Sequence, residues 1–188
     1  MSKYCFILFL AAVVLSGCGY EGIFDGRDKD VLAPLDPSVA FGNDKYDNFF
    51  KDGSFNYLCN TLFVELMSED QISSGMNDYA VVLNDTQLLH EVQTEGGQVY
   101  QWPDIDFENY SLVVGRWMDV GTTWYIKDQR AKKSPLGKVT IYLHFVKHEG
   151  GAFHQPRFRL FGAIYPKLPS GVAEIVRWEE DVVIPLSE

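Results

Sequence analysis

The stretch Tyr110-Ser111-Leu112-Val113-Val114-Gly115-Arg116-Trp117 decides the fold class of this chain. Valine and aromatic side chains favour extended backbone because they pack well on a pleated, half-buried surface. A short apolar run of this kind predicts a buried strand. Similar β-prone runs occur at residues 79–83, 122–127, 138–147, 157–165 and 172–178, and residues 181–185 add a possible edge strand. Most of the chain from residue 79 onward is therefore expected to be β-structure.

A short helix is expected directly after the strand at residues 79–83. Asn84-Asp85-Thr86 supplies good N-cap residues, and Leu88, Leu89 and Val92 follow at helical spacing. Gly96-Gly97 would end the element.

Residues 57–67 are largely apolar and fit two kinds of element. Leu58, Leu62 and Leu66 match a helix face, whereas Leu62, Val64 and Leu66 match one face of a strand, so periodicity leaves both open. Taken together, the segments predict an α+β, β-dominated fold, with an antiparallel sheet or half-open barrel and one short packed helix.

The N-terminus has the layout of a bacterial lipoprotein signal. Lys3 precedes an apolar run over residues 4–14, and Leu15-Ser16-Gly17-Cys18 reads as a lipobox. The run is too short to span a membrane, which takes about 20 apolar residues. We expect removal of residues 1–17 and a lipid on Cys18, which would anchor the protein to the membrane in the cell envelope, with the outer membrane as the favoured location.

Glycine, proline and acidic residues without a regular period predict a tether over residues 18–45. Residues 46–188 are long and apolar enough for a single globular β-rich domain. The expected organisation is a signal peptide at 1–17, the tether at 18–45 and this domain.

Charge is distributed unevenly and argues against nucleic acid as a partner. Residues 18–109 hold 4 basic and 18 acidic side chains, whereas residues 110–188 hold 11 and 8. A nucleic-acid binder needs a concentrated basic face, and here only Arg130, Lys132 and Lys133 cluster. We interpret these three as part of a solvated loop.

The three cysteines cannot form a disulfide within the mature chain. Cys5 leaves with the signal and Cys18 carries the lipid, so Cys59 is alone in the folded part. Its apolar neighbours predict a small buried side chain rather than a nucleophile, which would require a paired base.

The histidines around residues 149–153 are the strongest candidates for metal ligands, but no metal and no cofactor is assigned. His144 and His148 are four residues apart on a predicted strand, about 13 Å, and cannot share an ion. His148 and His154 could meet across the turn with Glu149 as a third ligand, as zinc or copper would require. Exposed polar residues beside a turn are the alternative interpretation.

Asp104, Asp106 and Glu108 recur at every second residue and would share one face of an extended segment. They could attract calcium or act as a glycosidase pair, but no calcium-binding loop motif is present. We interpret them as an acidic approach to the following strand.

Aromatic residues of the central strands are the candidate contact residues, provided that they are exposed. They are Trp117, Trp124 and Tyr125, and aromatic side chains are enriched where proteins bind one another. Serine-hydrolase, zinc-protease, dinucleotide and P-loop motifs do not occur in the sequence. No catalytic residue is assigned.

Residues 79–178 resemble, in layout, the PrcB C-terminal-like domains, small envelope domains associated with a bacterial surface protease complex. The likeness rests on residues 81–92, on Pro103-Asp104-Ile105-Asp106-Phe107 leading into Leu112-Val113-Val114-Gly115, and on the turn and strand at residues 121–126. Where that family has a glycine-glycine-aromatic turn, this chain has Thr122-Thr123-Trp124. The resemblance implies an accessory role in the envelope and supplies no catalytic residues.

Two functions are therefore expected. The first is a non-enzymatic, lipid-anchored module that binds or stabilises another envelope or secreted protein, such as a protease complex. The second is a module that binds a glycan or a small hydrophobic ligand with the same aromatic residues.

Overall fold

Strands dominate the computed structural model, which describes residues 30–41, 49–51, 53–67, 78–119, 124–148 and 157–184. The helical elements are α3 (Pro37–Phe41), η2 (Phe49–Lys51) and α4 (Gly53–Leu66). The strands are β1 (Val31–Leu32), β2 (Tyr79–Leu83), β3 (Val92–Gln93), β4 (Val99–Tyr100), β5 (Tyr110–Asp119), β6 (Trp124–Lys133), β7 (Val139–His148), β8 (Arg157–Pro166) and β9 (Gly171–Ile184).

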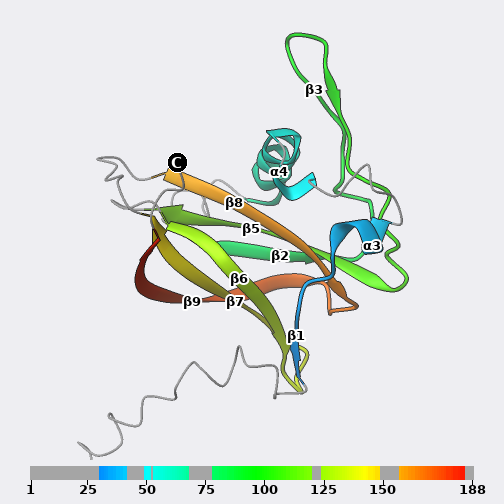
Figure 1. The fold of residues 1–188 in the computed structure, drawn as a ribbon. Helices are drawn as coiled ribbons and strands as arrows, with labels where there is room; N and C mark the ends of the chain where they lie inside the picture. The colour runs from blue at the N-terminus through cyan, green and yellow to red at the C-terminus, as the bar shows by residue number, and fades with distance from the viewer. Residues whose placement is uncertain are drawn as a thin grey trace, which may run out of the picture.

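The main sheet has the strand order β1-β6-β7-β9-β2-β5-β8 and curls into a half-barrel (Figure 1). Neighbouring strands are antiparallel except β7 and β9, which are parallel because β8 intervenes in the chain and lies at the far edge. The predicted β-dominated α+β fold is confirmed, and the sheet is mixed rather than purely antiparallel. Strands β3 and β4 form a separate hairpin.

The prediction of a short helix directly after residue 83 is wrong. The helix that packs on the sheet is α4. Asp85 accepts a hydrogen bond from the Gln87 N–H, and the Asn84 amide donates to the Leu168 carbonyl, so this segment is held as a turn. Leu88 and Leu89 are apolar because they pack against the core. The segment at residues 57–67 fits a helix or a strand by its sequence, and the structure confirms the helix, which is part of α4.

Part of the predicted tether belongs to the folded body. Val31 and Leu32 pair with β6, Leu35 pairs with Ile164 of β8, and α3 follows at once. Residues 31–41 are therefore not a free linker. No local pattern predicts this pairing, because a two-residue strand is too short to show a period.

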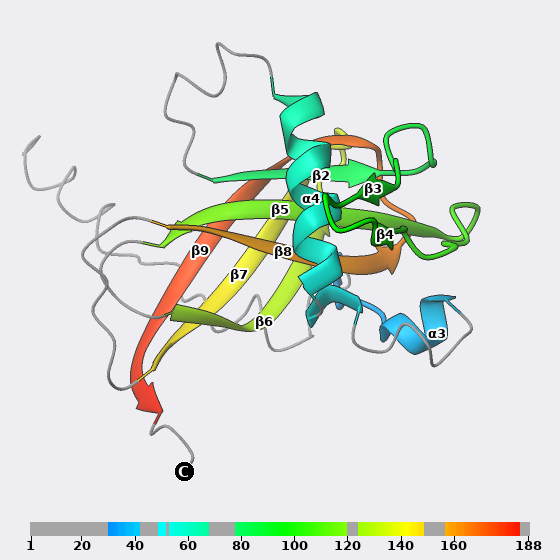
Figure 2. The ribbon, with the colours of Figure 1, turned by 90° about the horizontal axis from the view of Figure 1, so that it is seen from above.

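Two apolar clusters lie on the two faces of the sheet. The outer cluster, between the sheet and α4, contains Phe55, Leu58, Leu62, Val81, Leu112 and Ile164. Figure 2 shows α4 crossing this face above β2, β5 and β8. The interior cluster, inside the curl, contains Trp117, Ile141, Leu143, Phe145, Phe161 and Tyr165. The half-barrel is thus filled by side chains and covered on one outer face.

Cys59 belongs to the outer cluster and is fully buried, as predicted. Burial raises the pKa of its thiol, which keeps the group protonated and unreactive. Within the described ranges, no helix is both long and apolar enough to cross a bilayer.

Candidate functional site at the seam of the half-barrel

The half-barrel is open along one line, where β6 and β8 face each other without forming a strand pair. We call this line the seam. The segment around Leu35 crosses its end near β1: Val31 and Leu32 pair with β6, and the Leu35 N–H donates to the Ile164 carbonyl of β8 at 2.7 Å. Both pairings are antiparallel, so β6 and β8 run in the same direction.

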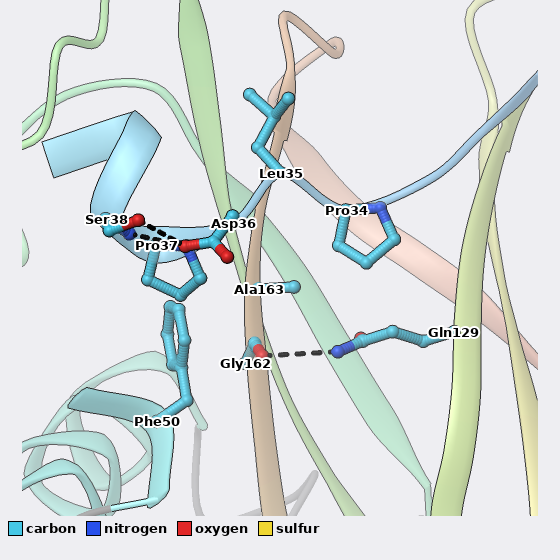
Figure 3. Close-up of a pocket in the computed structure, with 9 residues that line it drawn as sticks. All are labelled: Pro34, Leu35, Asp36, Pro37, Ser38, Phe50, Gln129, Gly162 and Ala163. Atoms are coloured by element: carbon cyan, nitrogen blue, oxygen red, sulfur yellow. Dashed lines mark hydrogen bonds between the residues drawn. The ribbon is translucent and has the colours of Figure 1, made fainter. Parts of the chain in front are cut away.

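A hollow of about 360 Å³ lies in the seam just beyond Leu35 (Figure 3). The residues that line it are Pro34, Leu35, Asp36, Pro37, Ser38, Phe50, Gln129, Gly162 and Ala163. They come from the β1–α3 segment, η2, β6 and β8, so every element that bounds the seam contributes to its wall.

The side chain of Gln129 closes the seam beside this hollow. Its Nε2 donates to the Gly162 carbonyl at 3.3 Å, and its Oε1 accepts from the Tyr165 hydroxyl at 3.5 Å. Burial, and to a lesser extent the charge of Asp128, raises the pKa of Tyr165, so the phenol keeps its proton and stays a donor. Directly paired strands lie about 4.8 Å apart and leave no room for a side chain between them. The gap at Gln129 is therefore wider than a strand pair.

The chain leaves the seam at Asp36 because this residue begins a helix. The Asp36 carboxylate accepts from the Ser38 N–H at 2.9 Å and from the Ser38 hydroxyl at 2.6 Å. These hydrogen bonds hold the pKa of Asp36 below its usual value. Pro37 occupies the first helical position, where no N–H is needed. The turn into α3 leaves the rest of the seam without a strand from this segment.

A second hollow, of about 300 Å³, lies further along β8 on the side of α4. Phe158, Arg159 and Leu160 line it from β8, and Asn56 and Asn60 line it from α4. The Phe158 side chain is half exposed, with a relative exposure of 53%. The two hollows thus lie along the same strand, β8.

The three predicted contact residues occupy different environments. Trp117 is 2% exposed and packs edge-on against Phe145 with ring centroids 4.6 Å apart, so it does not meet the condition of exposure on which its role as a contact depends. Side chains alternate between the two faces along β5, and the Trp117 side chain points into the curl. Trp124 and Tyr125 are half-buried at the start of β6. Trp124 packs against the interior cluster.

The acidic residues at 104, 106 and 108 are exposed and alternate with a buried Ile105. Asp106 accepts hydrogen bonds from the Asn109 side chain and from the N–H groups of Glu108 and Asn109. The Asn109 side chain contributes most to lowering the pKa of Asp106. This carboxylate shapes the turn before β5.

The proposed histidine site cannot be placed. Glu149 and His154 lie outside the described residues, as does Cys18, and the His148 side chain is likewise not described. Within the described ranges, no three metal-binding side chains gather.

The basic trio lies on strand β6 and not in a loop. Arg130 pairs with Asp128 at 3.1 Å. Strand pairing of Lys132 with Val31, and of its neighbours with β7, holds this segment in the sheet.

Sequence reasoning missed a polar cluster on the outer face of β6, β7 and β9. His144 is buried, stacks on Trp178 with ring centroids 4.0 Å apart and contacts Glu180 at 2.9 Å. Lys127 reaches the same carboxylate at 3.2 Å and contributes most to lowering the pKa of Glu180. Because these residues come from three strands, no local pattern could have linked them.

Comparison with known proteins gives one partial similarity. No protein family model and no solved structure matches the chain. The mitochondrial protein C2orf69 homolog of Mus musculus is 32% identical over 83 residues, which is 43% of this chain and 22% of the mouse protein. The match therefore spans about a fifth of the length of that relative.

Proposed function

We propose that this protein is a non-enzymatic module, anchored to the cell envelope through a lipid on Cys18, that binds or stabilises another envelope or secreted protein. The observation that carries the proposal is the open seam between β6 and β8. A strand at the edge of a sheet presents unpaired backbone groups, which are a template for another chain. Trp124 and Tyr125 lie at the start of β6, along this seam.

The filled interior of the half-barrel supports binding at the surface rather than inside the curl. Trp117 packs on Phe145, and the Arg177 guanidinium lies 5.3 Å and 4.9 Å from the centres of these two rings. Arg177 is itself held by Glu179 at 3.0 Å. A ligand entering here would have to displace packed side chains, which costs free energy.

The sequence resemblance supports one choice of partner. Residues 79–178 resemble the PrcB C-terminal-like domains, so a subunit of an envelope protease complex is the first partner to test. No residue of this chain is assigned a catalytic role in such a complex.

The test is chemical crosslinking of the native protein in its own envelope, followed by identification of what co-purifies. We expect one envelope protein to be recovered repeatedly. A Cys18→Ala variant should leave the membrane fraction and lose this partner, whereas the matched Cys59→Ala variant should retain both. A folded and anchored protein that recovers no envelope protein would contradict the proposal.

A second candidate function, binding of a glycan, is favoured by a different hollow. This hollow of about 440 Å³ is lined by Thr86, Leu89, His90, Glu91, Gln101, Trp102, Pro103 and Asp104. An indole ring can stack on a sugar, and polar side chains beside it can orient the sugar through hydrogen bonds. Titration with maltoheptaose, cellohexaose and chitohexaose should then change the tryptophan fluorescence of the protein but not that of Trp102→Phe. An unchanged signal with all three sugars would exclude binding of these glycan types.

A further inference from the structure

The seam already holds one strand, and this strand comes from the protein itself. Val31 and Leu32 pair with Lys132 and Ala131 of β6, and Leu35 pairs with Ile164 of β8 three residues later. At this end the gap between β6 and β8 is therefore one strand wide. The occupant is a polypeptide in extended conformation, which shows what kind of molecule fits the seam.

Beyond Leu35, the edge of β8 offers further backbone groups to such a strand. The Ile164 and Gly162 carbonyls both point away from β5, since Leu35 and Gln129 bond to them. Backbone direction alternates along a strand, so the N–H and C=O groups of Leu160 and Phe158 face the same side. Among the described residues, no hydrogen bond to these groups of Leu160 and Phe158 is found.

We infer that the open part of the seam, from Phe158 to Gly162, receives an extended segment of the partner protein as an added strand between β8 and β6. This inference rests on the proposed function and names how the partner is held. The added strand runs antiparallel to both neighbours, as the segment from Val31 to Leu35 does. Addition of a strand to an exposed edge is a recurring way to bind peptides, in which the main chain supplies affinity.

The side chains around the seam favour an uncharged segment. Arg130 is paired with Asp128 at 3.1 Å, and Arg159 is paired with Asp119 at 3.5 Å, so these two arginines have acidic partners within the protein. The Arg116 guanidinium lies 4.7 Å from the centre of the Phe158 ring and is engaged with that ring. The hollow beside Phe158 is lined by two asparagine amides, which donate and accept hydrogen bonds without charge. An apolar side chain of the segment would cover the part of the Phe158 ring that Arg116 leaves exposed.

Gln129 is the residue that moves when the segment enters. Its Nε2 bonds to the Gly162 carbonyl across the gap, a position that the backbone of an added strand would take. The amide can then donate to, and accept from, the incoming chain, so the displaced hydrogen bonds are replaced. In the free protein Gln129 therefore provides a hydrogen-bond donor to the Gly162 carbonyl at the edge of β8, and its side chain can move away when a strand is added.

The experiment is site-specific photocrosslinking of the full chain in its native envelope. A photoreactive benzoylphenylalanine replaces Phe158, and the control carries it at Val172, which is 66% exposed on β9. We expect a crosslink from position 158 to one short segment of one envelope protein, and at least a tenfold lower yield from position 172.

A proline at position 160 tests whether the backbone is used. Leu160→Pro removes an N–H that faces the seam and not β5, and it should lower the yield from position 158 at least tenfold, whereas Leu160→Ala should not. If the proline variant fails to fold, amide exchange of wild-type Leu160 decides the question. A synthetic copy of the crosslinked segment should slow that exchange at least tenfold.

The outcomes separate this inference from the proposed function. A partner that crosslinks from position 172 instead, or is insensitive to proline at 160 in a folded variant, overturns the strand addition and leaves the proposed function standing. Unchanged amide exchange at Leu160 does the same. Crosslinks between copies of this chain overturn the choice of occupant, and a protein that crosslinks to nothing overturns both proposals.

Discussion

Replacing Gly115 by alanine should destabilise the protein by about 2 kcal/mol, although alanine is the better residue in most strands. Gly115 of β5 lies directly opposite Phe161 of β8. A Cβ atom at position 115 would overlap the Phe161 ring, and this ring is 5% exposed inside the interior cluster. Overpacking of a core costs about 1–3 kcal/mol, and a ring enclosed on all sides belongs at the upper end. Alanine returns about 1 kcal/mol through lower chain entropy.

The assay is urea unfolding of the wild-type protein and of matched variants. Gly53→Ala is the control, since a Cβ there meets nothing within 4 Å, and it should not lower the free energy of unfolding. Adding Phe161→Leu to Gly115→Ala should recover at least about 1 kcal/mol relative to additivity, because residues in contact couple. A Gly115→Ala protein as stable as wild type, or strictly additive effects in the double variant, would refute this account of the packing.

Three further predictions concern the core and the seam. The Cys59 thiol should resist iodoacetamide at pH 8 in the native protein and react in urea, as followed by mass spectrometry of the peptide containing residue 59; rapid native labelling would contradict its burial. The Asp36 carboxyl should titrate below its ordinary value of 3.8 in NMR. Its stabilising effect is then present above that value and lost as the pH falls through the folded pKa, and Ser38→Ala should raise the midpoint; a midpoint that does not move would show that the Ser38 hydroxyl is not its partner. Trp117→Ala should lower the free energy of unfolding by about 3–5 kcal/mol, measured with urea, and a loss below about 1 kcal/mol would mean that the side chain is not a core residue.

The strands could be predicted because their residues carry a local signal. The run at residues 79–83 became β2 with the predicted bounds, and the run beginning at Tyr110 became β5. The pairing of β7 with β9 had no such signal, because it joins segments separated by all of β8. At Leu88 and Leu89 a local signal is present but misleading. Their spacing predicts a helix, whereas these side chains are apolar because they contact the outer cluster from a turn.

The candidate site was beyond sequence reasoning for a related reason. Gln129 and Gly162 have no motif around them, and their hydrogen bond depends on how two distant strands are placed by the rest of the sheet. Residue type alone makes Trp117 a candidate contact, because tryptophan is common at interfaces, but its position on β5 places the side chain in the interior. Residue type indicates what a side chain can do, whereas exposure and neighbours depend on topology.

The two edges of the seam differ in how well they are protected, and this difference indicates which strand binds. Proteins commonly guard an open edge with a bulge, a lysine or a proline. β6 has a register irregularity between Ile126 and Asp128, and Lys127 lies within it. β8 has no bulge in its pairing with β5. Its proline, Pro166, lies past Ile164, at the end that Leu35 covers, and the edge-facing positions of the open part are Phe158, Leu160 and Gly162. An edge without these features is a hazard in solution unless a partner covers it, so β8 is the edge on which a partner segment should be sought first.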